Sequence, residues 1–139
     1  MKRNRQAETL YVVIDTNVLV SAFWTEDGVA ARVLSMVFNR QITICYDFRI
    51  MEEYREVLMR RRFNFSEEEV EDVLSFIRAE GMSVIAAPLP IELPDQTDKK
   101  FFEVATQMNA FLISGNKKHF PSYEKIYTPA EFLEFHGLK

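Results

Sequence analysis

The sequence predicts an α/β fold, a three-layer sandwich in which helices flank a mostly parallel four- to five-stranded sheet. Residues 11–14 (YVVI) are apolar without polar alternation, which is typical of a strand covered on both faces in a parallel sheet. Strand-like runs then alternate with helical patterns along the chain, which favours βαβ units. With 139 residues, the chain is long enough to build one sizeable core. We therefore expect a single domain over residues 1–139, with residues 1–9 flexible.

The individual elements follow from residue type and spacing. Runs rich in β-branched and aromatic residues predict strands at residues 11–14, 42–46, 83–87 and 110–114, with a short edge strand at 123–127. Apolar residues at helical spacing predict helices at residues 18–23, 29–38, 48–62, 66–81, 95–109 and 130–135. Asp47 and Ser66 are the expected N-caps of two of these helices, and the three Glu after Ser66 complete a capping-box pattern. The three prolines within residues 88–94 indicate a loop.

Composition excludes several classes of function. A net charge of −4 gives the molecule no general attraction for nucleic acid, so binding a polyanion would require metal ions or the basic patches at residues 60–62, 99–100 and 117–119. The single cysteine, Cys45, excludes an internal disulfide and a thiolate metal cluster. The polar N-terminus shows no secretory pattern, and residues 11–14 are too short to span a bilayer. We expect a soluble, cytoplasmic protein that does not contact a membrane.

Four oxygen-bearing side chains are predicted near one end of the sheet. Asp15 directly follows the first strand, and Asn116 lies just beyond the fourth. Glu53 borders the buried stripe of the helix after the second strand, and Asp98 lies in the first turn of the helix before the fourth. Ligand crevices in parallel sheets lie beyond the carboxyl ends of the strands, so these side chains are candidates for a common site.

Each of these residues also has an ordinary structural explanation. Asp15 can cap the next helix, and Asp98 can offset a helix dipole. Glu53 can pair with Arg49 or Arg60 on the surface, and Gly-Asn is a common turn at the end of a strand. Taken together, however, three carboxylates in one small cleft repel each other, and a hard cation such as Mg²⁺ or Mn²⁺ removes that cost. Such an ion with open water positions suits phosphodiester hydrolysis.

The segments that carry these residues resemble PIN-domain nucleases, and among them the branch that comprises toxin components of toxin–antitoxin pairs. The similar segments are DTNVLVSA at 15–22, EYREVL at 53–58, Asp98 with Ala105 seven residues later, and ISGN at 113–116. The resemblance spans about residues 11–133 and implies that Asp15, Glu53 and Asp98 bind metal. Asp95 is an alternative ligand to Asp98, which we favour. Asn116 departs from the family, which usually has a fourth Asp in a Ser/Thr-Gly-Asp motif. An amide oxygen still ligates a metal but supplies no charge, so weaker metal binding is expected.

The resemblance implies a metal-dependent endoribonuclease that cleaves single-stranded RNA with Mg²⁺ or Mn²⁺, as the toxin of a toxin–antitoxin pair. It assigns catalysis and metal binding to the same four residues, which are Asp15, Glu53, Asp98 and Asn116. The basic residues at 60–62 and 117–118 then receive flanking phosphates. A small antitoxin protein and a homodimer are implied as well. The alternative is a catalytically weak or inactive PIN-fold module that binds RNA or protein, and the residues alone do not separate RNA from DNA.

Overall fold

The fold is built on one sheet of five strands within residues 9–136, which are the residues that the computed structural model describes. The strands are β1 (Leu10–Ile14), β2 (Ile42–Tyr46), β3 (Met82–Ser83), β4 (Phe111–Ile113) and β5 (Ile126–Tyr127). They lie in the order β3-β2-β1-β4-β5, and every pairing is parallel. The predicted α/β class with a parallel sheet is confirmed. The expected flexibility of residues 1–9 concerns positions outside the described residues, apart from Thr9.

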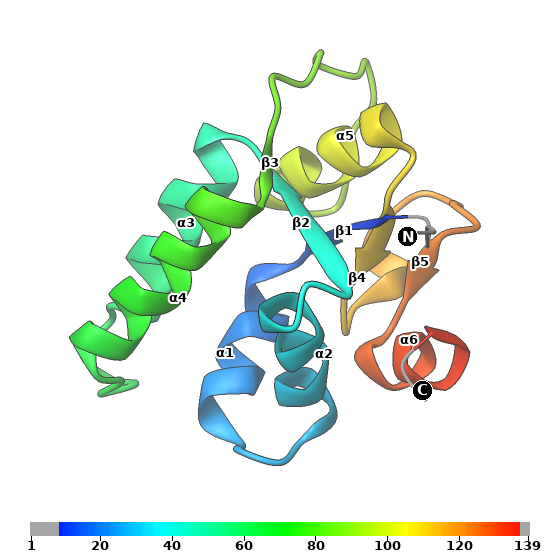
Figure 1. Ribbon diagram of the computed structural model, residues 1–139. Helices are drawn as coiled ribbons and strands as arrows, with labels where there is room; N and C mark the ends of the chain where they lie inside the picture. Colours follow the sequence, from blue (N-terminus) through cyan, green and yellow to red (C-terminus); the bar gives the residue numbers. More distant parts are fainter. Residues whose placement is uncertain (1–8, 137–139) are drawn as a thin grey trace.

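Helices cover both faces of this sheet. They are α1 (Thr16–Trp24), α2 (Val29–Phe38), α3 (Phe48–Leu58), α4 (Glu67–Glu80), α5 (Lys99–Met108) and α6 (Pro129–His136). Two short 3₁₀ turns, η1 (Gln96–Asp98) and η2 (Lys117–His119), precede α5 and follow β4. Crossovers between parallel strands are right-handed, so the connections from β1 to β2 and from β2 to β3 share one face, and α5 lies on the other (Figure 1). The protein therefore has the three layers that the sequence predicts.

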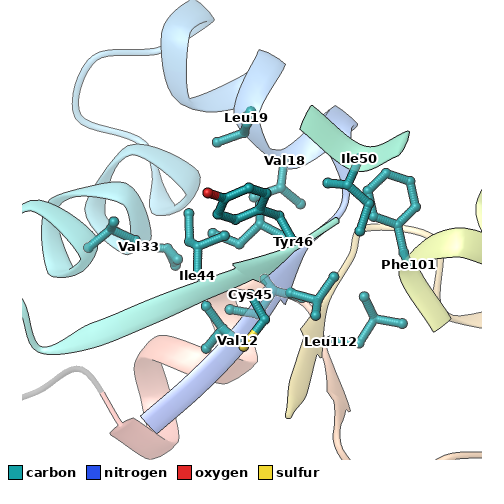
Figure 2. Packing of buried hydrophobic residues seen from close by; sticks show 14 of the residues in the cluster. Val12, Val18, Leu19, Val33, Ile44, Cys45, Tyr46, Ile50, Phe101 and Leu112 are labelled. Carbon is teal, nitrogen blue, oxygen red and sulfur yellow. The ribbon is translucent and has the colours of Figure 1, made fainter. Parts of the chain in front are cut away.

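The centre of the core is β1, which has a neighbouring strand on each side. Val12 and Val13 are fully buried, and Figure 2 shows core side chains of β1, β2 and β4 packed with Leu19 of α1, Ile50 of α3 and Phe101 of α5. Each fully buried side chain of this kind stabilises the fold by about 2 kcal/mol. The residue after β1 is thus presented from a rigid platform.

Several elements differ in extent from the sequence-based expectation, and the edge strand expected at residues 123–127 covers only Ile126–Tyr127. The third strand was expected at residues 83–87 but ends at Ser83, because Gln107 of α5 binds the main chain of Ile85 and Ala87 and draws it away from the sheet. The helix expected to reach residue 62 ends at Leu58. Beyond it, residues 59–65 turn so that the rings of Phe63 and Phe65 stack with their centres 5.2 Å apart. The Trp24 ring packs edge-on against both of them.

The predicted helix starts are confirmed at atomic level. The Asp47 carboxylate accepts a hydrogen bond from the Ile50 N–H at 3.0 Å, and the Ser66 hydroxyl accepts one from the Glu69 N–H at 3.2 Å. Each satisfies an N–H group that the first turn of a helix leaves without a partner. The cap at Asp47 fixes where α3 begins, and so which face of α3 Glu53 occupies.

Candidate active site

The topology places the site at the carboxyl ends of β1 and β4. From β1 the chain continues to β2 on one side, and from β4 it continues to β5 on the other, so the connections diverge between these two strands. Such a switch point leaves a crevice above the sheet. Asp15 follows β1, Ser114 to Asn116 follow β4, and the Asp15 N–H binds the Ile113 carbonyl at 3.0 Å. β1 and β4 are thus directly paired.

Asp15 is a buried carboxylate held by a buried hydroxyl. It is 5% exposed, and its Oδ2 accepts from the Ser114 hydroxyl at 2.7 Å. Ser114 Oγ in turn accepts from the Asn116 N–H at 3.0 Å. Burial raises the pKa of Asp15, and the charge of Glu53 raises it further, against the lowering by Ser114 and the nearby main-chain N–H groups. The site therefore carries negative charge that the fold compensates only in part.

Glu53 lies beside Asp15 because α3 is tied to the end of β1. The buried Tyr54 hydroxyl donates to the Ile14 carbonyl at 2.6 Å, one residue before Asp15. The two oxygens of Glu53 have different partners: Oε2 accepts from the Thr16 hydroxyl at 2.6 Å, and Oε1 lies 2.6 Å from the ammonium of Lys100. The surface pairs expected for Glu53, with Arg49 or Arg60, do not form, since those arginines pair with other acids.

Asp98 joins the same cluster from the opposite layer. It lies at the junction of η1 and α5, with its side chain 17% exposed. Partial burial raises its pKa to about 6, helped by the charges of Asp15, Asp95 and Glu53, while His119 opposes the rise. His119 Nδ1 lies 3.6 Å from Asp98 Oδ2. Asp98 therefore stays protonated up to a mildly acidic pH.

The structure brings three of the four predicted residues together through their carboxylates, and the fourth through its main chain. Asp15, Glu53 and Asp98 interact through their charges. Asn116 is anchored by its N–H, and the described residues show no hydrogen bond to its side-chain amide. Asp95 is exposed and caps η1 through Thr97, and those hydrogen bonds lower its pKa.

The donor chemistry of the cluster fits a hard divalent cation, but its present arrangement is not a finished coordination sphere. Carboxylate and amide oxygens are the ligands that Mg²⁺ and Mn²⁺ prefer. Among residues 9–136, however, no group of three or more Asp, Glu, His or Cys side chains is arranged to hold a metal ion. One of the three carboxylates, Glu53, has the Lys100 ammonium as a cationic partner at 2.6 Å.

Comparison of the sequence with known protein families identifies the family of this chain. The family profile of the PIN domain matches residues 11–118, which include all four candidate residues. The chain belongs to the PIN-domain family. PIN domains are generally nucleases that act on nucleic acid, and they generally use divalent metals. An uncharacterised protein of Methanocaldococcus jannaschii, MJ1680, is 28% identical over an alignment that covers 88% of this chain and 89% of that protein.

Three contacts of this PIN domain were not predicted from its sequence. Ser114, Thr16 and Lys100 each contact a candidate acid, yet hydroxyls and lysines near acids are too common to mark a site by type alone. Ser114 carried the clearest signal, since it directly follows a buried strand and precedes Gly115. No helix in the described part of the chain is long and apolar enough to cross a membrane.

Proposed function

We propose that this PIN domain is a metal-dependent endoribonuclease that cleaves single-stranded RNA. Asp15, Glu53 and Asp98 would hold a Mg²⁺ or Mn²⁺ ion, with the amide oxygen of Asn116 as an uncharged donor at the edge. When bound, the ion supplies a polarised water and charge for the scissile phosphate. The observation that carries the proposal is the cluster itself, three mutually repelling carboxylates at the switch point of the sheet.

The protein's own residues prepare this chemistry. Ser114 and Thr16 fix the orientation of Asp15 and Glu53, so neither carboxylate loses rotational freedom when it takes up a ligand. Asn116 leads directly into η2, which presents the exposed Lys118 and His119 at the mouth of the site. We propose that these two side chains contact phosphates next to the cleaved bond. Lys117, which the sequence also assigned to this role, pairs with Glu131 at 3.0 Å.

Cleavage of a labelled single-stranded RNA tests the proposal. We expect cleavage with Mg²⁺ or Mn²⁺, none with EDTA, and a loss of about a hundredfold or more in Asp15→Asn, because the variant removes a charged ligand while keeping the shape of the side chain. Glu52→Gln is the matched control, since Glu52 is exposed on α3 next to Glu53. This variant should cleave the RNA like wild type. A single-stranded DNA of the same sequence separates RNA from DNA as substrate. Equal cleavage by wild type and Asp15→Asn would exclude this site.

A second candidate function is a PIN-fold module that binds RNA or protein without cleaving it. Two observations favour it: an amide stands where PIN nucleases usually have a fourth acid, and Lys100 neutralises Glu53. The same assay decides between the two. RNA binding that is equal with Mg²⁺ and with EDTA, without cleavage in either, supports the module.

We also propose a small antitoxin protein as partner and a homodimer as assembly, on the resemblance to toxin components. A hollow of about 730 Å³ between α1, α2 and α4, lined by aromatic residues that include Trp24, Phe38 and Phe76, has room for part of such a partner. Co-expression with the product of an adjacent short reading frame tests the first proposal, and light scattering of the purified protein tests the second. Cleavage that the co-expressed protein leaves unchanged would argue against the antitoxin.

A further inference from the structure

Lys100 is an unusual lysine in this molecule. Its side chain is only 12% exposed, and its ammonium lies 2.6 Å from Glu53 Oε1 and also donates to the Thr97 carbonyl. The ammonium lies 5.2 Å from the centre of the Phe101 ring as well. A lysine is a flexible chain that normally keeps its charge in water, so three contacts on a largely buried side chain mark a held position.

Both carboxylate oxygens of Glu53, the partner of Lys100, are already in contact with a donor. Glu53 receives the Thr16 hydroxyl on one oxygen and the Lys100 ammonium on the other. A hydroxyl donor can stay beside a metal ion, because a carboxylate has about four lone-pair positions. An ammonium cannot stay in the same way, since it and a divalent cation repel each other at contact distance.

We propose that Lys100 is a built-in competitor of the divalent ion, whose ammonium neutralises Glu53 and must move away before Glu53 can bind metal. The inference rests on the proposed function, because it assumes that Glu53 is a metal ligand. It gives Lys100 a positioning role: it keeps the cluster folded without metal and sets how much free metal the site requires. The Lys100 side chain has space to move into, since it lines a hollow of about 490 Å³ that Arg49, Glu56 and Gln96 also line.

Mn²⁺ binding to Lys100→Met tests this competition directly. Methionine keeps most of the length and the apolar stem of lysine and removes the charge. We expect the dissociation constant for Mn²⁺ to fall by about tenfold, because one like charge next to the ion is removed. The electron paramagnetic resonance signal of the free ion measures it. Without metal, the variant should melt at a lower temperature than wild type, and saturating Mn²⁺ should raise its melting temperature more. Lys99→Met is the matched control and should bind Mn²⁺ like wild type.

A double-mutant cycle ties the effect to Glu53. In the Glu53→Gln background the added Lys100→Met change should give no gain in Mn²⁺ affinity, because the competition has lost its target. An independent measurement on wild type, free of any folding defect, follows the Lys100 side-chain resonances during a Mg²⁺ titration. They should shift with metal occupancy, while those of Lys99 should not.

The outcomes separate this inference from the proposed function. Equal or weaker Mn²⁺ binding by Lys100→Met, or Lys100 resonances that stay unchanged while Mg²⁺ binds, overturns the competitor role and leaves the metal site intact. An equal gain in the Glu53→Gln background also overturns it. Absence of Mn²⁺ binding in both wild type and Lys100→Met overturns the inference and the metal-dependent nuclease together.

Discussion

Asp98 illustrates how a single residue stores unfavourable charge at this site. Its carboxyl has a pKa of about 6, against an ordinary value of 3.8, because burial and the neighbouring acids favour the protonated form. Between these two values the folded protein binds more protons than the unfolded chain, so stability falls as the pH rises through this window. Near neutral pH, metal-free Asp98 therefore works against folding.

Asp98→Asn is expected to stabilise the metal-free protein. Near neutral pH with EDTA present, the free energy of unfolding should rise by on the order of 1 kcal/mol, a value reduced for the partial solvent access of the side chain. The gain should shrink as the pH falls from about 6 towards 3.8, where wild-type Asp98 becomes neutral as well. Urea denaturation at several pH values measures it.

Asp95→Asn provides the control for this prediction. Asp95 is three residues away on the same segment, but its pKa is lowered by hydrogen bonds from Thr97, so its charge favours the folded state. The variant should therefore show no gain near neutral pH. A gain of equal size in both variants would contradict the assignment of the stored charge to Asp98.

At the scale of elements, Glu103 fastens the proline-rich loop to α5 and α3. It is 3% exposed, accepts from the Leu89 N–H at 2.9 Å, and pairs with Arg49 at 2.9 Å. Arg49 also pairs with Asp47, the N-cap of α3. This chain of contacts holds the loop that leads into Asp98.

Glu103→Ala is expected to lower the free energy of unfolding by about 2–3 kcal/mol, because it leaves the Leu89 N–H without a partner and opens space in a buried contact. The Leu89 amide should also exchange its hydrogen faster, whereas Glu103→Gln, which keeps an acceptor, should be milder. Glu52→Ala, at an exposed position of α3, should stay within about 0.5 kcal/mol of wild type. Equal stabilities of Glu103→Ala and Glu52→Ala would exclude the fastening role.

The junction of α4 and β3 depends on space at Gly81. A Cβ there would lie 2.5 Å from the Ile77 carbonyl oxygen and 2.7 Å from that of Ile44. Both are main-chain atoms, so the helix and β2 would have to separate. Gly81→Ala should therefore cost about 2 kcal/mol in thermal or urea unfolding.

Gly115 is the matched control for Gly81. A Cβ at Gly115 would meet nothing within 4 Å, so Gly115→Ala should leave stability nearly unchanged even though it lies next to the site. A loss at Gly115 equal to that at Gly81 would show that chain flexibility, and not space, decides both positions.

At the scale of the whole molecule, the parts set by local chemistry were predictable from the sequence. The apolar run of β1, the caps at Asp47 and Ser66, and the alternation of strands with helices are decided by neighbouring residues, and each is confirmed. The predicted third strand was too long because Gln107, distant in sequence, binds Ile85 and Ala87. Long-range pairing of this kind leaves no mark in a local pattern.

The same limit applies to the site. The positions of Asp15 and Asn116 follow from the ends of two strands, which the sequence indicates, together with a pairing of those strands that the structure confirms. The partner of Glu53 does not follow, because Lys100 and Lys99 are adjacent and equally basic, and only the start of α5 decides which one faces α3. Metal binding and RNA cleavage stay predictions.

The Ser114 hydroxyl, which donates to Asp15 and accepts from the Asn116 N–H, has a consequence for substitutions at position 116. Ser114 binds the main chain at position 116, and the side chain there makes no hydrogen bond among the described residues. An exchange of Asn116 for Asp would add one negative charge beside the candidate site while the loop keeps its anchor. The charge next to the three carboxylates can thus change by a single substitution without loss of the main-chain hydrogen bond that anchors the loop.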